Sequence, residues 1–443
     1  MERLNRWWLT LIGVGMVAYA AAVVWGQVAR LRFFAGAPIE WQSLIPAVLI
    51  GVVGVIALVF ELLRQPDDPR PHLLAQAMES YIAAWRRLWG TKWLLWLYGS
   101  IAAIAASGSV AQSMLVRHYM PERFVHSTLA APGLDATRLL MLLQDLVKGA
   151  FDAFIPSVPF FPNEFGYAAA ALVTVVLVLP RVSRLSREPR CEGKTGFFAF
   201  CMVLAALSCV AVPYAWMVYL ARIASASGSG GHDDEMRFTL VYMEIAGLVA
   251  AVILSGALTA GVLGSLARSR DGDQDAKRTF LPDAVRFFAP LAGFCLIIDL
   301  AVSAAYLPYY LRLGSAHAAL SSWPPILHAL ISIGFLLLMF APFGIVTRGL
   351  GLGKSISHSV GVWKQTWRNA IVLIAVGSFL YAVAMAPGGV MSVLVGRSSW
   401  TLVPWGAVSS AISVAVRALM LLAAWEFYVA NVQEPRGVVE EGV

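Results

Sequence analysis

Two ionisable residues lie deep inside apolar segments, where a charge is costly unless it is paired or hydrated. Asp299 occurs in FCLIIDLAVS, and Arg417 occurs in ISVAVRALML. Counted along helices at about 1.5 Å per residue, the two residues lie at depths that an arginine side chain can bridge. We therefore predict an Asp299–Arg417 pair between two membrane helices. The alternative is that each side chain separately finds backbone, water or a neighbouring hydroxyl.

Two glutamates, Glu244 in VYMEIAGL and Glu426 in AAWEFYV, lie nearer the ends of their apolar segments. Either carboxylate could bind a substrate or a proton, and either could equally extend to the membrane surface. A substrate route through the membrane would be lined by Asp299, Arg417 and Glu244. The sequence contains no Ser-His-Asp arrangement at membrane depth, no paired carboxylates at helical spacing and no zinc-protease signature. We therefore predict no catalytic residue and no enzyme activity.

Three short motifs resemble ligand sites but lack required residues. GLGLGKS has Arg348 where a phosphate loop needs glycine, and DGDQDA has Ala276 where a calcium loop needs glycine. The adjacent acidic residues of GSGGHDDE do not converge on one ion without help. The four cysteines form no Cys-x-x-Cys motif. We therefore predict no metal site and no cofactor.

The composition of the chain is that of a membrane protein. Of its 443 residues, 13% are charged, which is about half the usual share, and the mean hydropathy is +0.72. Apolar runs of about 20 residues, long enough to cross about 30 Å of hydrocarbon, recur along the whole chain. We expect an all-α, polytopic bundle of about ten transmembrane helices, near residues 7–26, 43–63, 93–115, 165–181, 196–221, 238–266, 284–310, 324–347, 369–395 and 403–431.

The distribution of basic residues predicts which ends of these spans face the cytoplasm. Cytoplasmic segments are enriched in lysine and arginine, and roughly two thirds of the 33 Lys and Arg residues fall on one side if the N-terminus is cytoplasmic. Both termini are then cytoplasmic, and we expect the protein in the bacterial inner membrane. The net charge of +7 requires no nucleic-acid partner, because this bias and the attraction to anionic lipids account for it.

The spans pair into hairpins within one membrane domain, residues 1–443. We expect hairpins at 1–63, 77–181, 182–267, 268–347 and 348–443, the last ending in a short cytoplasmic tail. The long outer segment 116–165 contains LDATRLLMLLQDLVKGAFDAF, whose apolar spacing predicts an amphipathic helix. That helix would lie on the outer leaflet or cap the bundle, and it could also serve as a lid or a docking surface.

Basic aromatic segments precede several spans and predict cytoplasmic interfacial helices. In SYIAAWRRLWG and SHSVGVWKQTWRN, the tryptophans are four residues apart and therefore share a helix face, beside cations that can reach headgroup phosphates. An ordinary aromatic belt explains this pattern, and a lipid-sensing role is the alternative. The predicted lipid-contacting residues are Trp85, Arg86, Arg87, Trp89, Trp363, Lys364, Trp367 and Arg368.

The passage FLLLMFAPFGIVTRGLGLGKSISHSVGVWKQTWRNAIVLIAV resembles the repeat of a set of bacterial membrane proteins of mostly unknown function, which includes the membrane domain of glycerophosphodiester phosphodiesterases. The likeness extends over residues 255–380, faintly in 255–301. The shared pattern is a proline at the end of one span, then a basic turn, then a Ser/Trp-rich helix before the next span. Here it consists of Pro342, Arg348, Ser355, Ser359, Trp363, Trp367 and Arg368. The resemblance implies the helical fold. It implies no catalytic residue, because the enzymes of that set carry catalysis in a separate soluble domain.

These observations favour a non-catalytic integral membrane protein, a scaffold or accessory subunit whose partners are membrane lipids and other integral membrane subunits. The alternative is a transporter of a small or lipidic substrate. A cavity near the membrane midplane that is reached by Asp299, Arg417 and Glu244 would favour transport.

Overall fold

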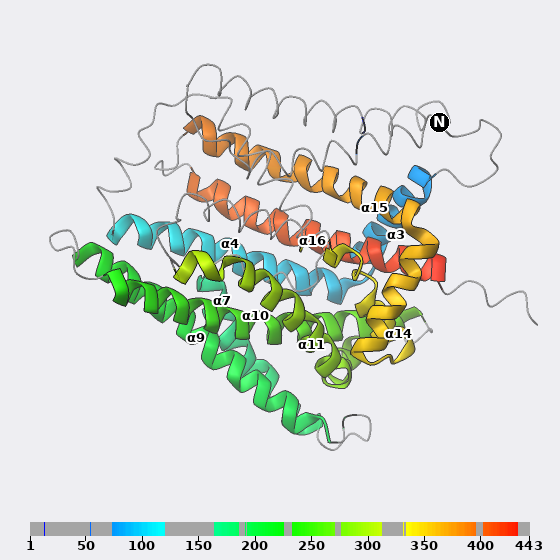
Figure 1. Ribbon diagram of the computed structural model, residues 1–443, viewed down its shortest axis with the longest axis horizontal. Coiled ribbons are helices and arrows are strands. Elements are labelled where there is room, and N and C mark those ends of the chain that lie inside the picture. Colours follow the sequence, from blue (N-terminus) through cyan, green and yellow to red (C-terminus); the bar gives the residue numbers. More distant parts are fainter. Residues whose placement is uncertain are drawn as a thin grey trace, which may run out of the picture.

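The computed structural model describes residues 13, 54, 73–119, 164–185, 191, 193–225, 233–270, 276–311, 331, 334–395 and 402–432. All regular structure in these residues is helical, without a strand. The long helices lie side by side as a bundle (Figure 1). Apart from residues 13 and 54, the first spans expected, 7–26 and 43–63, lie outside the described residues, as does the part 120–163 of the expected outer segment.

Seven apolar stretches in the described helices are long enough to cross a membrane, which makes the chain a multi-pass membrane protein. They are Lys92–Ala111, Gly166–Leu185, Thr195–Tyr219, Val241–Arg268, Thr279–Ala301, Leu352–Met385 and Pro404–Val432. They lie in the helices α4 (Lys92–Tyr119), α7 (Glu164–Val173) with its continuation, α9 (Thr195–Ser225), α10 (Asp233–Arg270), α11 (Ala276–Leu311), α15 (Leu352–Val395) and α16 (Leu402–Val432). Each corresponds to one of the ten expected spans. The span expected at 324–347 is described mainly from residue 334 onward.

One span contains a π-helical turn. After α7 the chain continues as η1 (Thr174–Val178) and α8 (Leu179–Leu185), and the backbone N–H of Leu179 donates to the carbonyl of Thr174, five residues earlier. Pro180 follows directly. Because proline has no N–H and its ring crowds the carbonyl four residues earlier, a wider turn here lets the helix continue without breaking.

Glycines on one face of α10 allow α11 to approach its backbone closely. A β-carbon on Gly264 would lie 2.5 Å from the β-carbon of Asp283, and one on Gly256 would lie 2.8 Å from the α-carbon of Ala292. Both distances are too short for real atoms, so only glycine fits. Such small-residue contacts are typical of membrane helices, whose association depends on close packing.

A second group of helices packs around α16, which contacts α4, α15 and the short helix α3 (Leu73–Gly90). Its inward face is filled by side chains that are almost fully buried, including Leu422, Trp425 and Phe427. These side chains join Leu94 of α4 and Leu373 of α15 in the largest apolar cluster among the described residues. In Figure 1, α3 and the beginning of α15 lie at one end of this group, beside α14 (Ala341–Arg348).

Candidate functional site

The polar side chains gather at the bundle end formed by α3, α14 and the beginning of α15. The helix α3 is amphipathic: Leu74, Tyr81 and Leu88 are buried, whereas Trp85 and Trp89 are 52% and 54% exposed. The two indole rings lie 5.5 Å apart between centroids, and Arg86 beside them is exposed. The sequence predicts lipid contact for these three residues, and that contact stays a prediction.

Arg87 turns in the other direction, toward α16. Its Nε atom lies 2.6 Å from Oε1 of Glu426, and the two side chains are only 24% and 16% exposed. Arg87 was predicted to reach headgroup phosphates, and Glu426 to bind a substrate or extend to the membrane surface. The structure instead joins them in an ion pair that fastens the end of α3 to α16.

A chain of amides connects α3, α15 and α16. Asn369 donates to the side-chain oxygen of Gln76 over 2.5 Å, Gln76 donates to Asn431 over 2.9 Å, and Asn431 donates to the carbonyl of Phe427. One turn further along α3, the Tyr81 hydroxyl donates to the Leu373 carbonyl over 3.0 Å. Burial raises the pKa of Tyr81, so this phenol stays protonated and remains a donor.

The chain before α14 forms a turn whose backbone groups are bonded by side chains of α15. Trp363 Nε1 donates to the carbonyl of Leu336 over 2.9 Å, and Ser359 Oγ donates to the carbonyl of Leu337 over 2.7 Å. Ser359 also accepts the N–H of Phe340 over 3.2 Å. Backbone that is not helical can lie inside a membrane protein only when such partners satisfy it.

This arrangement places Trp363 differently from the expected lipid contact. Its side chain is only 9% exposed and packs against Phe340, with ring centroids 6.1 Å apart, because the turn before α14 fills the space beside it. Trp367, one turn later, is 37% exposed, and Arg368 stacks over its ring at 5.4 Å. Lys364 is exposed as well.

A histidine and a tyrosine connect α15 to α16 beside the same turn. His358 Nε2 lies 2.8 Å from Tyr428 Oη, and Thr347 Oγ1 lies 3.4 Å from that oxygen. Gly344 makes room for the imidazole, since a β-carbon there would lie 2.7 Å from His358 Cδ2. The sequence contains no signal for this group, because its members lie on three helices and meet only through packing.

The charged residues expected inside the membrane lie on helices with different main neighbours. Asp299 lies on α11, which packs mainly against α10, while Arg417 lies on α16, which packs against α3, α4 and α15. The Asp299–Arg417 pair therefore stays a prediction. Both residues are partly buried, and Arg417 Nε is a buried atom without a hydrogen-bond partner among the described residues. Glu244 belongs to α10, and its side chain lies outside the described part.

The buried ion pair of the α10–α11 interface was not expected from the sequence. Arg268 near the end of α10 pairs with Asp283 of α11, whose side chain has no exposed surface. Asp283 packs against Gly264, so the glycine and the ion pair belong to the same close contact. The sequence neighbours of Asp283 do not reveal a partner 15 residues earlier.

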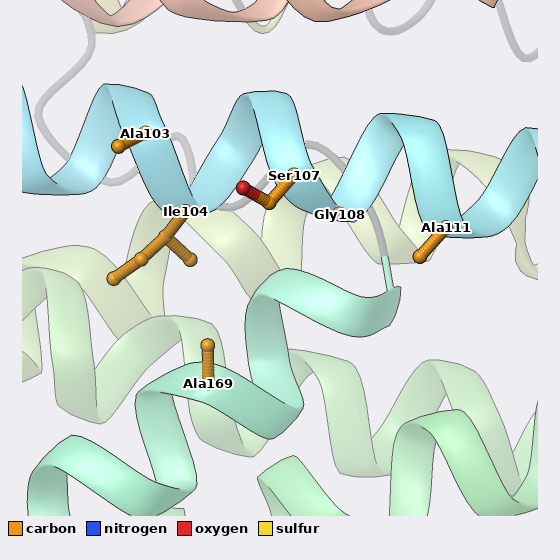
Figure 2. Close-up of a pocket in the computed structure, with 6 residues that line it drawn as sticks. All are labelled: Ala103, Ile104, Ser107, Gly108, Ala111 and Ala169. Atoms are coloured by element: carbon orange, nitrogen blue, oxygen red, sulfur yellow. The ribbon is translucent and has the colours of Figure 1, made fainter.

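An apolar groove of about 340 Å³ lies between α4 and α7. Figure 2 shows its lining residues, which are Ala103, Ile104, Ser107, Gly108, Ala111 and Ala169. All except Ile104 are small, and Ser107 provides the one hydroxyl among them. The groove can accept an apolar chain or a helix, and it contains no charged group.

The described polar groups can therefore hold helices together, and the groove can accept an apolar partner. No group of three or more histidine, cysteine or acidic residues in the described part could hold a metal ion. Comparisons with protein-family models, with curated proteins and with solved structures found no match to this chain.

Proposed function

We propose that this multi-pass membrane protein is a non-catalytic component of a larger membrane assembly, a scaffold or accessory subunit. The observation that carries the proposal is the groove between α4 and α7. Ala103, Ser107 and Ala111 follow one another at intervals of four residues and so lie on one face of α4. Small residues at this spacing let the backbone of a second helix approach closely.

The occupant we propose is a transmembrane helix of another subunit. From Ala103 to Ala111 the groove extends along about 12 Å of helix, about two turns, which suits a short helix–helix contact. The polar groups at the bundle end support a structural role, because Arg87 bonds to Glu426 and the Gln76 amide bonds to both Asn369 and Asn431. These contacts stiffen the framework on which a partner would dock.

Copurification from the native membrane tests the proposal. We expect a stoichiometric integral membrane protein to accompany the wild-type chain in mild detergent and to be lost from Ser107→Phe, whose added ring fills the groove. The matched control is Leu207→Phe, which adds bulk at a 65% exposed position of α9 and should retain the partner. A wild-type chain that migrates alone, or equal loss from both variants, would refute the docking proposal.

Transport of a small or lipidic substrate is the second candidate, and Arg417 favours it. Its buried Nε has no hydrogen-bond partner among the described residues, and intramembrane cations of this kind mark substrate pathways. If the purified chain carries a tightly held anionic molecule, Arg417→Gln should release it and Ser107→Phe should not. Asp299→Asn and a substitution of Glu244 would then test the rest of the predicted route.

The membrane location belongs to the same proposal. We place the chain in the bacterial inner membrane with both termini cytoplasmic, so that α3 and the beginning of α15 lie at the cytoplasmic surface. The support is the distribution of cations, since Arg86, Lys354, Lys364 and Arg368 are exposed at this end of the bundle. We further propose that the likeness to the bacterial membrane repeat reflects a shared helical fold.

A further inference from the structure

An apolar cluster at the shared end of three spans is surrounded by cations. Val182 of α8, Phe198 of α9 and Phe288 of α11 are almost completely buried together, and the rings of Phe198 and Phe288 pack edge to face with centroids 5.0 Å apart. We call this group the α8–α9–α11 cluster. It is separate from the groove and from the polar groups of α3, α15 and α16.

Four cations border the α8–α9–α11 cluster, and all four are exposed. Arg181 and Arg184 lie on α8 beside Val182, Lys194 directly precedes α9, and Arg286 lies on α11. Lys194 Nζ donates to the backbone carbonyl of Arg286 over 3.4 Å. The Lys194 ammonium is therefore held against the backbone of α11 at Arg286, whose own guanidinium lies over the ring of Phe287, 4.9 Å from its centroid.

One carboxylate of the described residues, Asp283, attracts Arg286. It has no exposed surface and also pairs with Arg268, so it compensates the four exposed cations only in part. The connection between α8 and α9 contributes two arginines and two glutamates by sequence, which cancel in charge and lie outside the described residues. The cationic border therefore has room for an external anion.

The position of the cations points to a lipid headgroup. The three apolar spans of these helices end at Leu185 and begin at Thr195 and Thr279, so Arg184 and Lys194 lie at the boundary of the hydrocarbon. Arg286 lies seven residues after Thr279, about 10 Å along its helix, and its backbone carbonyl is within reach of Lys194. Directly below them on α9, Phe197 and Phe200 are 56% and 65% exposed. The anionic headgroup of a lipid bound here would contact the cations, and its acyl chain would contact the exposed apolar side chains.

We propose that the border of the α8–α9–α11 cluster binds an anionic phospholipid, with Lys194 and Arg286 contacting the phosphate and Phe197 and Phe200 contacting an acyl chain. Basic sites between membrane helices at this level bind such headgroups by charge and shape. The site does not depend on the proposed role as a scaffold or on the groove between α4 and α7.

Lipid titration of the delipidated protein in neutral detergent tests the site. Phosphatidylglycerol and phosphatidylcholine with the same acyl chains are added, and bound lipid is counted by native mass spectrometry. We expect phosphatidylglycerol to bind more tightly. The double variant Lys194→Gln/Arg286→Gln should lose about fivefold in affinity for each cation removed. This factor corresponds to the attraction between one Lys or Arg side chain and an anionic membrane surface.

Lys92→Gln/Lys354→Gln is the matched control, because it removes the same charge from exposed positions of α4 and α15 and should leave the affinity unchanged. Equal losses in both double variants would mean attraction to the whole charged surface and would overturn the proposed site. A competition with millimolar inorganic phosphate separates the two sources of phosphate: complete displacement of the lipid would indicate a soluble-anion site and refute the phospholipid. A melting temperature equal to wild type without lipid confirms that the variants fold.

Discussion

At the scale of single residues, the polar side chains at the bundle end act mainly on the backbone. Ser359 and Trp363 supply hydrogen bonds to carbonyls of the turn before α14, and Tyr81 does the same for Leu373. A buried backbone group that loses its partner costs about 1–3 kcal/mol. Because these donors are buried and already engaged, a structural role explains them without a ligand.

Ser359→Ala should destabilise the protein by about 2 kcal/mol, because the change leaves both the Phe340 N–H and the Leu337 carbonyl without their side-chain partner. The free energy of unfolding in mixed detergent micelles measures the loss. Amide hydrogen exchange of residues 336–340 should also become faster. Ser357→Ala, at an exposed position two residues earlier on the same helix, is the control and should change neither quantity. Unchanged exchange in Ser359→Ala would contradict the bonding role.

The Arg87–Glu426 ion pair should contribute to stability more than a surface pair does. Exposed pairs contribute about 0–1 kcal/mol, whereas breaking a buried pair costs about 3–5 kcal/mol. For side chains 24% and 16% exposed, we expect a coupling energy of about 1–2 kcal/mol between these limits. A double-mutant cycle with Arg87→Ala and Glu426→Ala measures this energy. Additive losses would show that the two side chains act independently, as a lipid-facing Arg87 would.

At the scale of elements, the α10–α11 interface depends on glycines, which have no side chain to keep the two helices apart. Gly256 and Gly264 bring the two helices so close that Asp283 is sealed against α10 beside its partner Arg268. Close contact strengthens dispersion between helices and excludes lipid from the ion pair. The α10–α11 interface therefore combines the glycine face of α10 with the charged Asp283 of α11, which would be costly in contact with lipid.

Gly264→Ala should separate α10 from α11 and destabilise the protein by about 1–3 kcal/mol, the usual cost of forcing an extra carbon into a packed interface. Thermal unfolding in detergent provides the measurement. Gly361→Ala on α15, where an added β-carbon meets nothing within 4 Å, is the matched control. It should be neutral or stabilising by up to about 1 kcal/mol, because alanine favours helix more than glycine does. Equal melting temperatures for the two variants would be incompatible with the close contact.

At the scale of the whole molecule, two groups of helices share one polar end. One group contains α9, α10 and α11, and the other surrounds α16. The α4–α7 contact and the packing of α14 against α10, α11 and α15 join them. Exposed cations occur at this shared end on α3, α8, α11 and α15, which fits one orientation of the whole bundle in the membrane.

Cysteine labelling tests that orientation. The four native cysteines are buried, so they should not react with a maleimide in the folded protein. We expect Met114→Cys, past the end of the α4 span, to react with a membrane-impermeant maleimide on intact cells. Lys354→Cys should react only after permeabilisation. The opposite pattern would reverse the orientation, and reaction of both sites on intact cells would contradict a membrane-spanning bundle between them.

The sequence by itself determined the helical membrane architecture and the approximate location of the described spans, although the stretch Leu352–Met385 begins 17 residues before the expected span 369–395. Hydrophobic length is a local property, because each helix satisfies its own backbone and must match the thickness of the bilayer. The seven apolar stretches of the described helices therefore agree with the expected spans. The amphipathic character of α3 followed in the same way from the spacing of its residues.

Tertiary structure alone decided which polar groups meet. Arg87 and Trp363 carry the same sequence signal as Arg86 and Trp367, yet Arg87 pairs with Glu426 and Trp363 donates to Leu336. The Asp299–Arg417 pair stays a prediction, and its two members lie on helices with different main neighbours. A pairing depends on how each helix is rotated and what packs beside it, and those are non-local properties that residue spacing along one helix does not contain.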